Sequence, residues 1–119
     1  MRVLVVDDDM AMATLLRDTL ERHRYRVIVA GGADQALDAV EADRPDAVLI
    51  DKEMPGMNGL DLLPLLRNRL PEVPLILMTA FGGQWVAAEA FARGADRYLE
   101  KPFRVSDLLA ILGSLPSSS

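Results

Sequence analysis

The sequence contains no cysteine. Disulfide bonds, thiolate metal sites and thiol nucleophiles are therefore excluded, and nothing ties the fold to an oxidising compartment. Its one histidine, His23, cannot build an imidazole-rich metal site, and it lies between two arginines as a solvated residue would. No apolar run approaches the length that crosses a membrane. The N-terminal run at residues 3–6 is too short for a signal peptide, so we expect a cytoplasmic protein without a membrane segment.

Positive charge is also in short supply. The chain has 13 Lys and Arg against 18 Asp and Glu, a net charge of −5, which argues against direct contact with nucleic acid. Its 119 residues are half apolar and 26% charged, as in a single globular domain. We assign residues 1–113 to this domain, and the Ser-rich residues 114–119 to a linker or a disordered tail.

Short apolar segments alternate with helical patterns along the chain. Strands are predicted near 3–6, 27–29, 47–50, 75–78 and 97–99, and helices near 10–23, 33–40, 60–70, 84–93 and 105–112. Strands that are apolar throughout are buried on both faces, which indicates a parallel sheet with helices on each side. We therefore predict an α/β fold with a doubly wound, five-stranded sheet. The second strand ends in Ala30 and glycines rather than polar residues, which fits an edge position away from a site.

In open parallel sheets, ligands bind beyond the carboxyl ends of the strands. Those ends carry Asp7-Asp8-Asp9, Asp51, Thr79 and Glu100-Lys101-Pro102. Carboxylates gathered at one place repel each other by about 4 kcal/mol per pair unless a cation lies among them. A few oxygen ligands suit Mg²⁺ better than Ca²⁺ or Zn²⁺. An aspartate beside magnesium and a phosphoryl donor can act as a nucleophile and form an aspartyl phosphate.

Each of these residues also has an ordinary structural explanation. Asp9 precedes an amphipathic helix and is best explained as its N-cap. Asp51 could simply open a turn-rich segment, Lys101 could be an exposed lysine, and Thr79 a β-branched strand residue. Three acids in a row exceed what one cap needs, so Asp7 and Asp8 are the stronger local signal. The joint placement of these side chains at strand ends favours a functional site.

Four segments together resemble the receiver domains of bacterial response regulators. They are Val5-Val-Asp-Asp-Asp9, Asp51-Lys-Glu-Met-Pro-Gly-Met-Asn-Gly59, Met78-Thr-Ala80 and Glu100-Lys-Pro-Phe103. The resemblance covers residues 2 to about 112, and the wording around Thr79 and Tyr98 is most similar to receivers of nitrogen-regulation-type transcriptional activators. It implies a flavodoxin-like (βα)5 fold with strand order 2-1-3-4-5.

The resemblance also implies a role for each site residue. Asp51 would accept the phosphoryl group from a sensor histidine kinase or a phosphotransfer protein. Mg²⁺ would be held by Asp8 directly, by Asp7 through water, by Asp51 and by the backbone carbonyl of Glu53. Lys101 would contact the phosphoryl oxygens, across a cis bond to Pro102. Thr79 would swing toward the phosphate, and the switch aromatic Tyr98 would turn inward with it.

Phosphorylation would then bias an output surface formed by the fourth helix, fifth strand and fifth helix. A homodimer through this surface, or an output domain beyond residue 119, would respond to that bias. Such a domain is a phosphoacceptor with slow self-dephosphorylation rather than a turnover enzyme. Lys52 and Glu53 depart from the commoner family pattern, and we predict that Glu53 alters the lifetime of the aspartyl phosphate.

Several alternatives stay open at the level of sequence. Tyr98 could be a half-buried aromatic with its hydroxyl in water, and Trp85 could belong to the core or to an exposed apolar patch. A magnesium-dependent phosphohydrolase also uses an aspartyl nucleophile, although it usually needs a longer chain. A flavin-binding electron carrier shares the fold, but its first loop must cradle a phosphate that three aspartates would repel. A receiver-like module that never takes phosphate is the third alternative.

Overall fold

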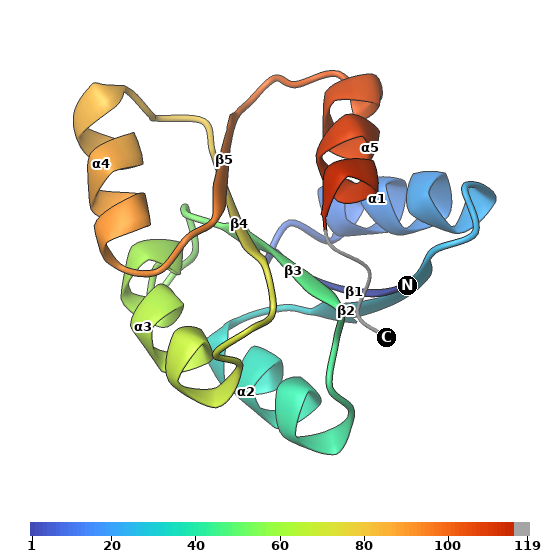
Figure 1. Ribbon diagram of the computed structural model, residues 1–119, viewed down its shortest axis with the longest axis horizontal. Helices are drawn as coiled ribbons and strands as arrows, with labels where there is room; N and C mark the ends of the chain where they lie inside the picture. Colours follow the sequence, from blue (N-terminus) through green and yellow to red (C-terminus); the bar gives the residue numbers. More distant parts are fainter. Residues whose placement is uncertain (116–119) are drawn as a thin grey trace.

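The computed structural model describes residues 1–115, in which five strands alternate with five helices (Figure 1). The strands are β1 (Arg2–Val6), β2 (Arg26–Ala30), β3 (Ala47–Asp51), β4 (Leu75–Thr79) and β5 (Arg97–Glu100). The helices are α1 (Met10–Arg22), α2 (Ala33–Ala42), α3 (Gly59–Arg69), α4 (Gln84–Ala92) and α5 (Val105–Ser114). Every element predicted from the hydrophobic pattern is present, within about two residues of its predicted bounds.

The five strands form one parallel sheet in the order β2-β1-β3-β4-β5. This confirms the predicted fold class, the strand order and the edge position of β2. All residues of β3 and β4 are buried, as their unbroken apolar sequences predicted. The edge strands β2 and β5 instead mix buried and exposed residues, because each has a sheet neighbour on one side only.

Alternate side chains of each strand point into two separate hydrophobic cores. One core packs β1, β3 and β4 against α2, α3 and α4, with Ile50, Leu63 and Leu77 at its centre. The other packs the opposite face against α1 and α5, through Leu49 and Leu20 among others. Figure 1 shows the same two layers, with α1 and α5 together on one side of the sheet. Both faces of the central strands are therefore covered, and polar groups can gather only at the strand ends.

Helix α3 contains a proline, and the residue that follows α4 supplies the hydrogen-bond donor that the proline lacks. Pro64 has no N–H to donate to the carbonyl of Leu60, four residues earlier. The guanidinium of Arg93, at the end of α4, donates to that carbonyl at 3.3 Å and also to Asp61 at 3.1 Å. The helix starts at Gly59, a few residues before the proline as predicted, and Asn58 caps it through the Asp61 N–H.

The last described residues continue the fold beyond the predicted domain end. Ser114 is the final residue of α5, and the Leu115 side chain is buried in the core beneath α1 and α5. The rest of the predicted tail, residues 116–119, lies outside the described residues. Within residues 1–115, no helix combines the length and apolar character needed to cross a membrane.

Candidate phosphoryl-transfer site

The polar strand ends meet at one edge of the sheet. Asp7 and Asp8 follow β1, Asp51 ends β3, and Thr79 ends the neighbouring β4. Lys101 directly follows β5, and its backbone N–H donates to the Thr79 carbonyl at 2.8 Å. The structure thus brings the side chains predicted from the strand ends to a common edge, because parallel strands terminate together.

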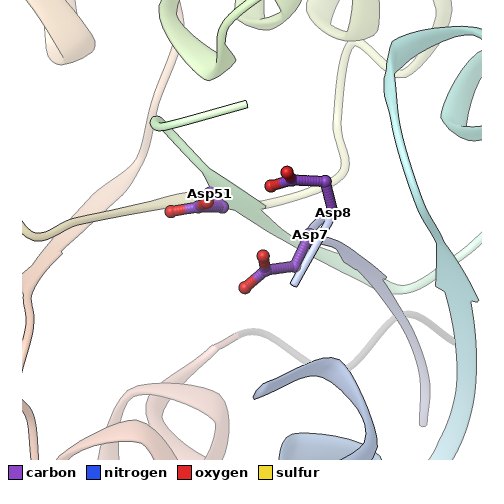
Figure 2. Close-up of side chains that lie close together, drawn as sticks. All are labelled: Asp7, Asp8 and Asp51. Atoms are coloured by element: carbon purple, nitrogen blue, oxygen red, sulfur yellow. The ribbon is translucent and has the colours of Figure 1, made fainter. Parts of the chain in front are cut away.

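Three aspartates form the centre of this edge. One carboxylate oxygen from each of Asp7, Asp8 and Asp51 lies within 4.8 Å of the others. Figure 2 shows Asp7 and Asp8 reaching from the end of β1 toward the space beside Asp51, which comes from β3. Asp7 is fully buried and Asp51 is 3% exposed, whereas Asp8 is open to solvent. The cluster therefore has a buried base and an accessible side.

Asp7 has a buried oxygen without a hydrogen-bond donor. Its Oδ1 accepts from the Asp9 N–H at 2.9 Å, but among the described residues no group donates to Oδ2. The Lys101 ammonium is 3.8 Å from Oδ2, which is an ion-pair distance and too long for a hydrogen bond. Burial raises the pKa of Asp7 to about 6, and the charge of Asp51 adds to that effect. A buried carboxylate oxygen without a donor is what a bound cation would satisfy.

Lys101 and Asp51 form a direct ion pair. The ammonium nitrogen lies 2.9 Å from Asp51 Oδ1, and the Lys101–Pro102 peptide is cis, as the resemblance implied. Burial raises the pKa of the Asp51 carboxyl, while the hydrogen bond from Lys101 opposes that rise. Burial lowers the pKa of Lys101, but its bond to Asp51 outweighs this effect and the net shift is upward. The proton of this pair therefore stays on the lysine.

The Glu53 side chain has partners that the sequence did not indicate. Its Oε2 accepts from the Thr79 hydroxyl at 2.6 Å, and its Oε1 accepts from the Ala80 N–H at 2.7 Å. Lys52 lies 3.5 Å away as an ion-pair partner. Burial acts to raise the pKa of Glu53, but these hydrogen bonds and the Lys52 charge more than offset it, and the net shift is downward. Glu53 is therefore an ionised side chain fixed across the end of β4.

Tyr98 is half-buried, and its hydroxyl contacts the N-cap residue of α4. Its hydroxyl accepts from the Gly83 N–H at 3.1 Å and lies 3.3 Å from Glu100 Oε2. The ring packs against the core shared by α2, α3 and α4. Burial raises the pKa of the Tyr98 phenol, and the bond from Gly83 opposes that rise. The hydroxyl is thus bonded to protein, which differs from the simple alternative of a hydroxyl in water.

Three other sequence interpretations can be compared with the structure. Asp9 is the N-cap of α1 and accepts from Ala11 at 3.1 Å and Met12 at 3.2 Å, which confirms its assignment as a cap. Trp85 is 87% exposed and so belongs to the surface rather than the core. His23 is also exposed, and its ring nitrogen Nδ1 lies 2.9 Å from the backbone carbonyl oxygen of Thr19.

Two glycines near the site were not singled out from sequence. A Cβ on Gly59 would lie 2.5 Å from the Asp51 carbonyl oxygen, so α3 can start this close to β3 only at glycine. A Cβ on Gly82 would overlap the Tyr98 hydroxyl and the Glu100 carboxylate. A glycine pair directly after Thr79-Ala80-Phe81 was the available signal for the second position.

Comparison with known protein families decides between the classes that share this fold. The family model for the response regulator receiver domain matches residues 3–113. The chain belongs to this family. A receiver domain of two-component response regulators is therefore favoured over a phosphohydrolase or a flavin carrier, and the resemblance seen in the four motifs is confirmed.

Individual relatives agree with this assignment. The response regulator protein FleR of Pseudomonas aeruginosa is 40% identical over 98% of this chain. The receiver domain of NtrX from Brucella abortus is 31% identical, with a TM-score of 0.87 over 93% of this chain and 94% of that one. A response regulator from Burkholderia pseudomallei, solved with a phosphorylated aspartic acid, a calcium ion and citrate, is 32% identical. Its TM-score is 0.89, over 95% of this chain and 66% of that one.

The chain spans only part of its curated relatives. It covers 26% of FleR and 50% of another matched response regulator. What those longer proteins do as a whole is therefore a separate question from the chemistry of the receiver domain.

Proposed function

We propose that this receiver domain is phosphorylated on Asp51 by a sensor histidine kinase or a phosphotransfer protein and switches an output surface in response. The observation that carries the proposal is the buried Asp7–Asp51 pair, in which an Asp7 oxygen has no donor within residues 1–115 and Lys101 is bonded to Asp51. In the transfer, an Asp51 oxygen forms a bond to phosphorus while the bond from phosphorus to the donor nitrogen breaks. The phosphohistidine nitrogen leaves with the electron pair of that bond.

The residues present fit a magnesium ion. Asp7, Asp8 and Asp51 offer oxygen ligands only, and the exposed side of the cluster leaves room for water, as magnesium prefers. The Glu53 backbone carbonyl is the proposed further ligand. When bound, the ion would neutralise charge that develops on the transferred oxygens. Lys101 keeps its proton and offers a second positive charge at the Asp51 oxygen it already contacts.

The domain acts as a switch rather than as a turnover enzyme. An aspartyl phosphate adds negative charge and acceptor oxygens that the Lys101 ammonium and the Thr79 hydroxyl can bind. Lys101 follows β5, and Thr79 precedes α4, so shifts of these two side chains toward the phosphoryl group would both act on the region of α4 and β5. We infer that α4, β5 and α5 form the output surface. An output domain or a second copy of the chain would recognise its altered shape.

The test is phosphorylation by acetyl phosphate, with and without magnesium, on the wild type and on Asp51→Asn. We expect one phosphoryl group per wild-type chain in the presence of magnesium and none on the variant, as measured by intact-protein mass. Labelling that persists in Asp51→Asn, or that ignores magnesium, contradicts the proposal. A wild-type protein that takes no label would instead favour a receiver-like module that never accepts phosphate.

A further inference from the structure

The hydrogen-bond donors at the end of β4 are already occupied. A threonine hydroxyl has one proton and a backbone amide has one, so each can make one strong donated bond at a time. The Thr79 proton goes to Glu53 Oε2 at 2.6 Å, and the Ala80 proton goes to Glu53 Oε1 at 2.7 Å. The Thr79 oxygen also accepts from the Phe81 N–H at 3.0 Å, which fixes the hydroxyl further.

These two donors lie beside the phosphoacceptor. Asp51 pairs with Met78 across β3 and β4, and the Lys52 N–H donates to the Met78 carbonyl at 2.8 Å. Thr79, the last residue of β4, and Ala80 come next along the chain, where a group attached to Asp51 would need donors for its oxygens. Glu53 is near enough that its charge raises the pKa of Asp51. A carboxylate and a phosphoryl group both carry anionic oxygens, and both can accept hydrogen bonds from these donors.

We propose that the Glu53 carboxylate is an internal competitor of the phosphoryl group, which must displace it from the Thr79 hydroxyl and the Ala80 N–H. Glu53 is thus a positioning residue that acts through Thr79 and holds the domain in its unphosphorylated form. The inference rests on the proposed phosphorylation of Asp51. It goes beyond a change in phosphate lifetime, because it predicts an energetic cost for gaining the phosphoryl group as well.

The Glu53 carboxylate can rotate away from Thr79 and Ala80 without its charge becoming buried and unpaired. The Glu53 side chain is 28% exposed and already lies beside the ammonium of Lys52, whose side chain is 22% exposed. An outward rotation would keep that ion pair near solvent while freeing both donors. The bonds that are lost are charge-assisted, so displacing them opposes phosphoryl binding by a measurable amount.

The experiment measures binding of beryllofluoride, a phosphoryl mimic, with magnesium. We expect Glu53→Ala to bind it roughly tenfold more tightly than wild type, the factor that corresponds to releasing about one charge-assisted hydrogen bond. Glu53→Gln should fall between the two, because one amide oxygen can still accept from one of the two donors. Glu72→Ala is the matched control, since it removes an exposed acid from the loop at the opposite end of β4.

A double-mutant cycle separates competition from simple charge repulsion. If Glu53 acts through the donors, the gain from Glu53→Ala must shrink in a Thr79→Val background, where one donor is gone. Repulsion alone predicts an undiminished gain in that background and equal effects of Glu53→Ala and Glu53→Gln, and that result overturns the inference. In the protein without beryllofluoride, the Ala80 amide proton should move upfield in Glu53→Ala, as its bond to a carboxylate is lost.

The outcomes distinguish this inference from the proposed function. If wild type binds beryllofluoride and Glu53→Ala binds it equally, the competition is absent while phosphorylation of Asp51 stands. If neither protein binds beryllofluoride or takes label from acetyl phosphate, the proposed function fails and the competition fails with it.

Discussion

At the scale of single residues, the ionised carboxylate of Asp7 destabilises the folded protein when no cation is bound. Its carboxyl is fully buried, and its pKa rises from 3.8 to about 6. A group whose pKa is raised by folding binds its proton more tightly in the native state. Its contribution to the free energy of unfolding is therefore most favourable at low pH, and declines as pH rises from 3.8 to about 6.

The substitution Asp7→Asn removes this titration. Without magnesium, we expect the variant to exceed wild type in free energy of unfolding by about 2 to 3 kcal/mol near pH 7, and by much less near pH 4. Urea denaturation of both proteins across this range measures the difference. With magnesium the order should reverse, because the neutral amide is a weaker ligand. A constant difference across the pH range would contradict the burial of an ionised Asp7.

The positions of these residues were largely predictable, whereas their contacts were not. Asp7, Asp51, Thr79 and Lys101 follow or end apolar strands, and parallel topology alone brings such ends together. The Glu53 contact to Thr79 depends on how the chain turns between β3 and α3, which no periodicity encodes. The family resemblance implied that the backbone carbonyl of Glu53 is a Mg²⁺ ligand, and it implied no contact for the Glu53 side chain.

At the scale of elements, Tyr98 links β5 to the start of α4, and Gly82 makes the link sterically possible. The Tyr98 hydroxyl accepts from Gly83, and any Cβ at position 82 would overlap that hydroxyl. Gly82→Ala should therefore displace the Tyr98 ring and break the bond to Gly83. We expect a loss of about 1 kcal/mol in the free energy of unfolding and a change in the Tyr98 ring signals by NMR.

Gly31→Ala provides the matched control for this substitution. Nothing lies within 4 Å of a Cβ added at Gly31, which follows β2 at the far edge of the sheet. It should leave the Tyr98 signals as they are in wild type. Unchanged Tyr98 signals in Gly82→Ala would show that the ring does not rest against this glycine.

Element boundaries show the same division between what sequence can and cannot predict. The start of α1 directly after its N-cap Asp9 followed from capping chemistry. The bonds around Pro64 did not, because the donor that replaces its missing N–H comes from Arg93, the residue that follows α4. Arg67 is a similar case: its guanidinium donates to the carbonyls of Gly94 and Val73. From sequence it was only a basic residue in a leucine-rich helix.

At the scale of the whole molecule, both faces of the sheet are covered by helices, yet α4 and the loop before it expose large aromatic side chains. Trp85 is 87% exposed and Phe81, just before the helix, is 73% exposed. Large exposed aromatic residues are typical of interaction sites. Phe81 lies on the segment that joins the site residue Thr79 to α4, and Trp85 lies on α4 itself, so a change at the site can alter their arrangement.

We expect this surface to mediate self-association when Asp51 carries beryllofluoride. Trp85→Ala should then weaken the dimer by roughly tenfold or more, the effect typical of an aromatic hot spot. Sedimentation velocity with magnesium, with and without beryllofluoride, measures the dimer constant. Leu15→Ala is the control, because Leu15 is 57% exposed on α1, across the sheet from α4 (Figure 1). Equal weakening by both substitutions would argue against a dimer through α4.

The most direct measurement is to locate the phosphoryl group on the chain. After reaction with acetyl phosphate and magnesium, borohydride reduction converts an aspartyl phosphate to homoserine, and peptide mass spectrometry then identifies the modified residue. We predict a single modified position, Asp51, although Asp7 and Asp8 lie in the same cluster. Modification at Asp7 or Asp8 instead, or no modification at any aspartate, would contradict the assignment of Asp51 as the phosphoacceptor.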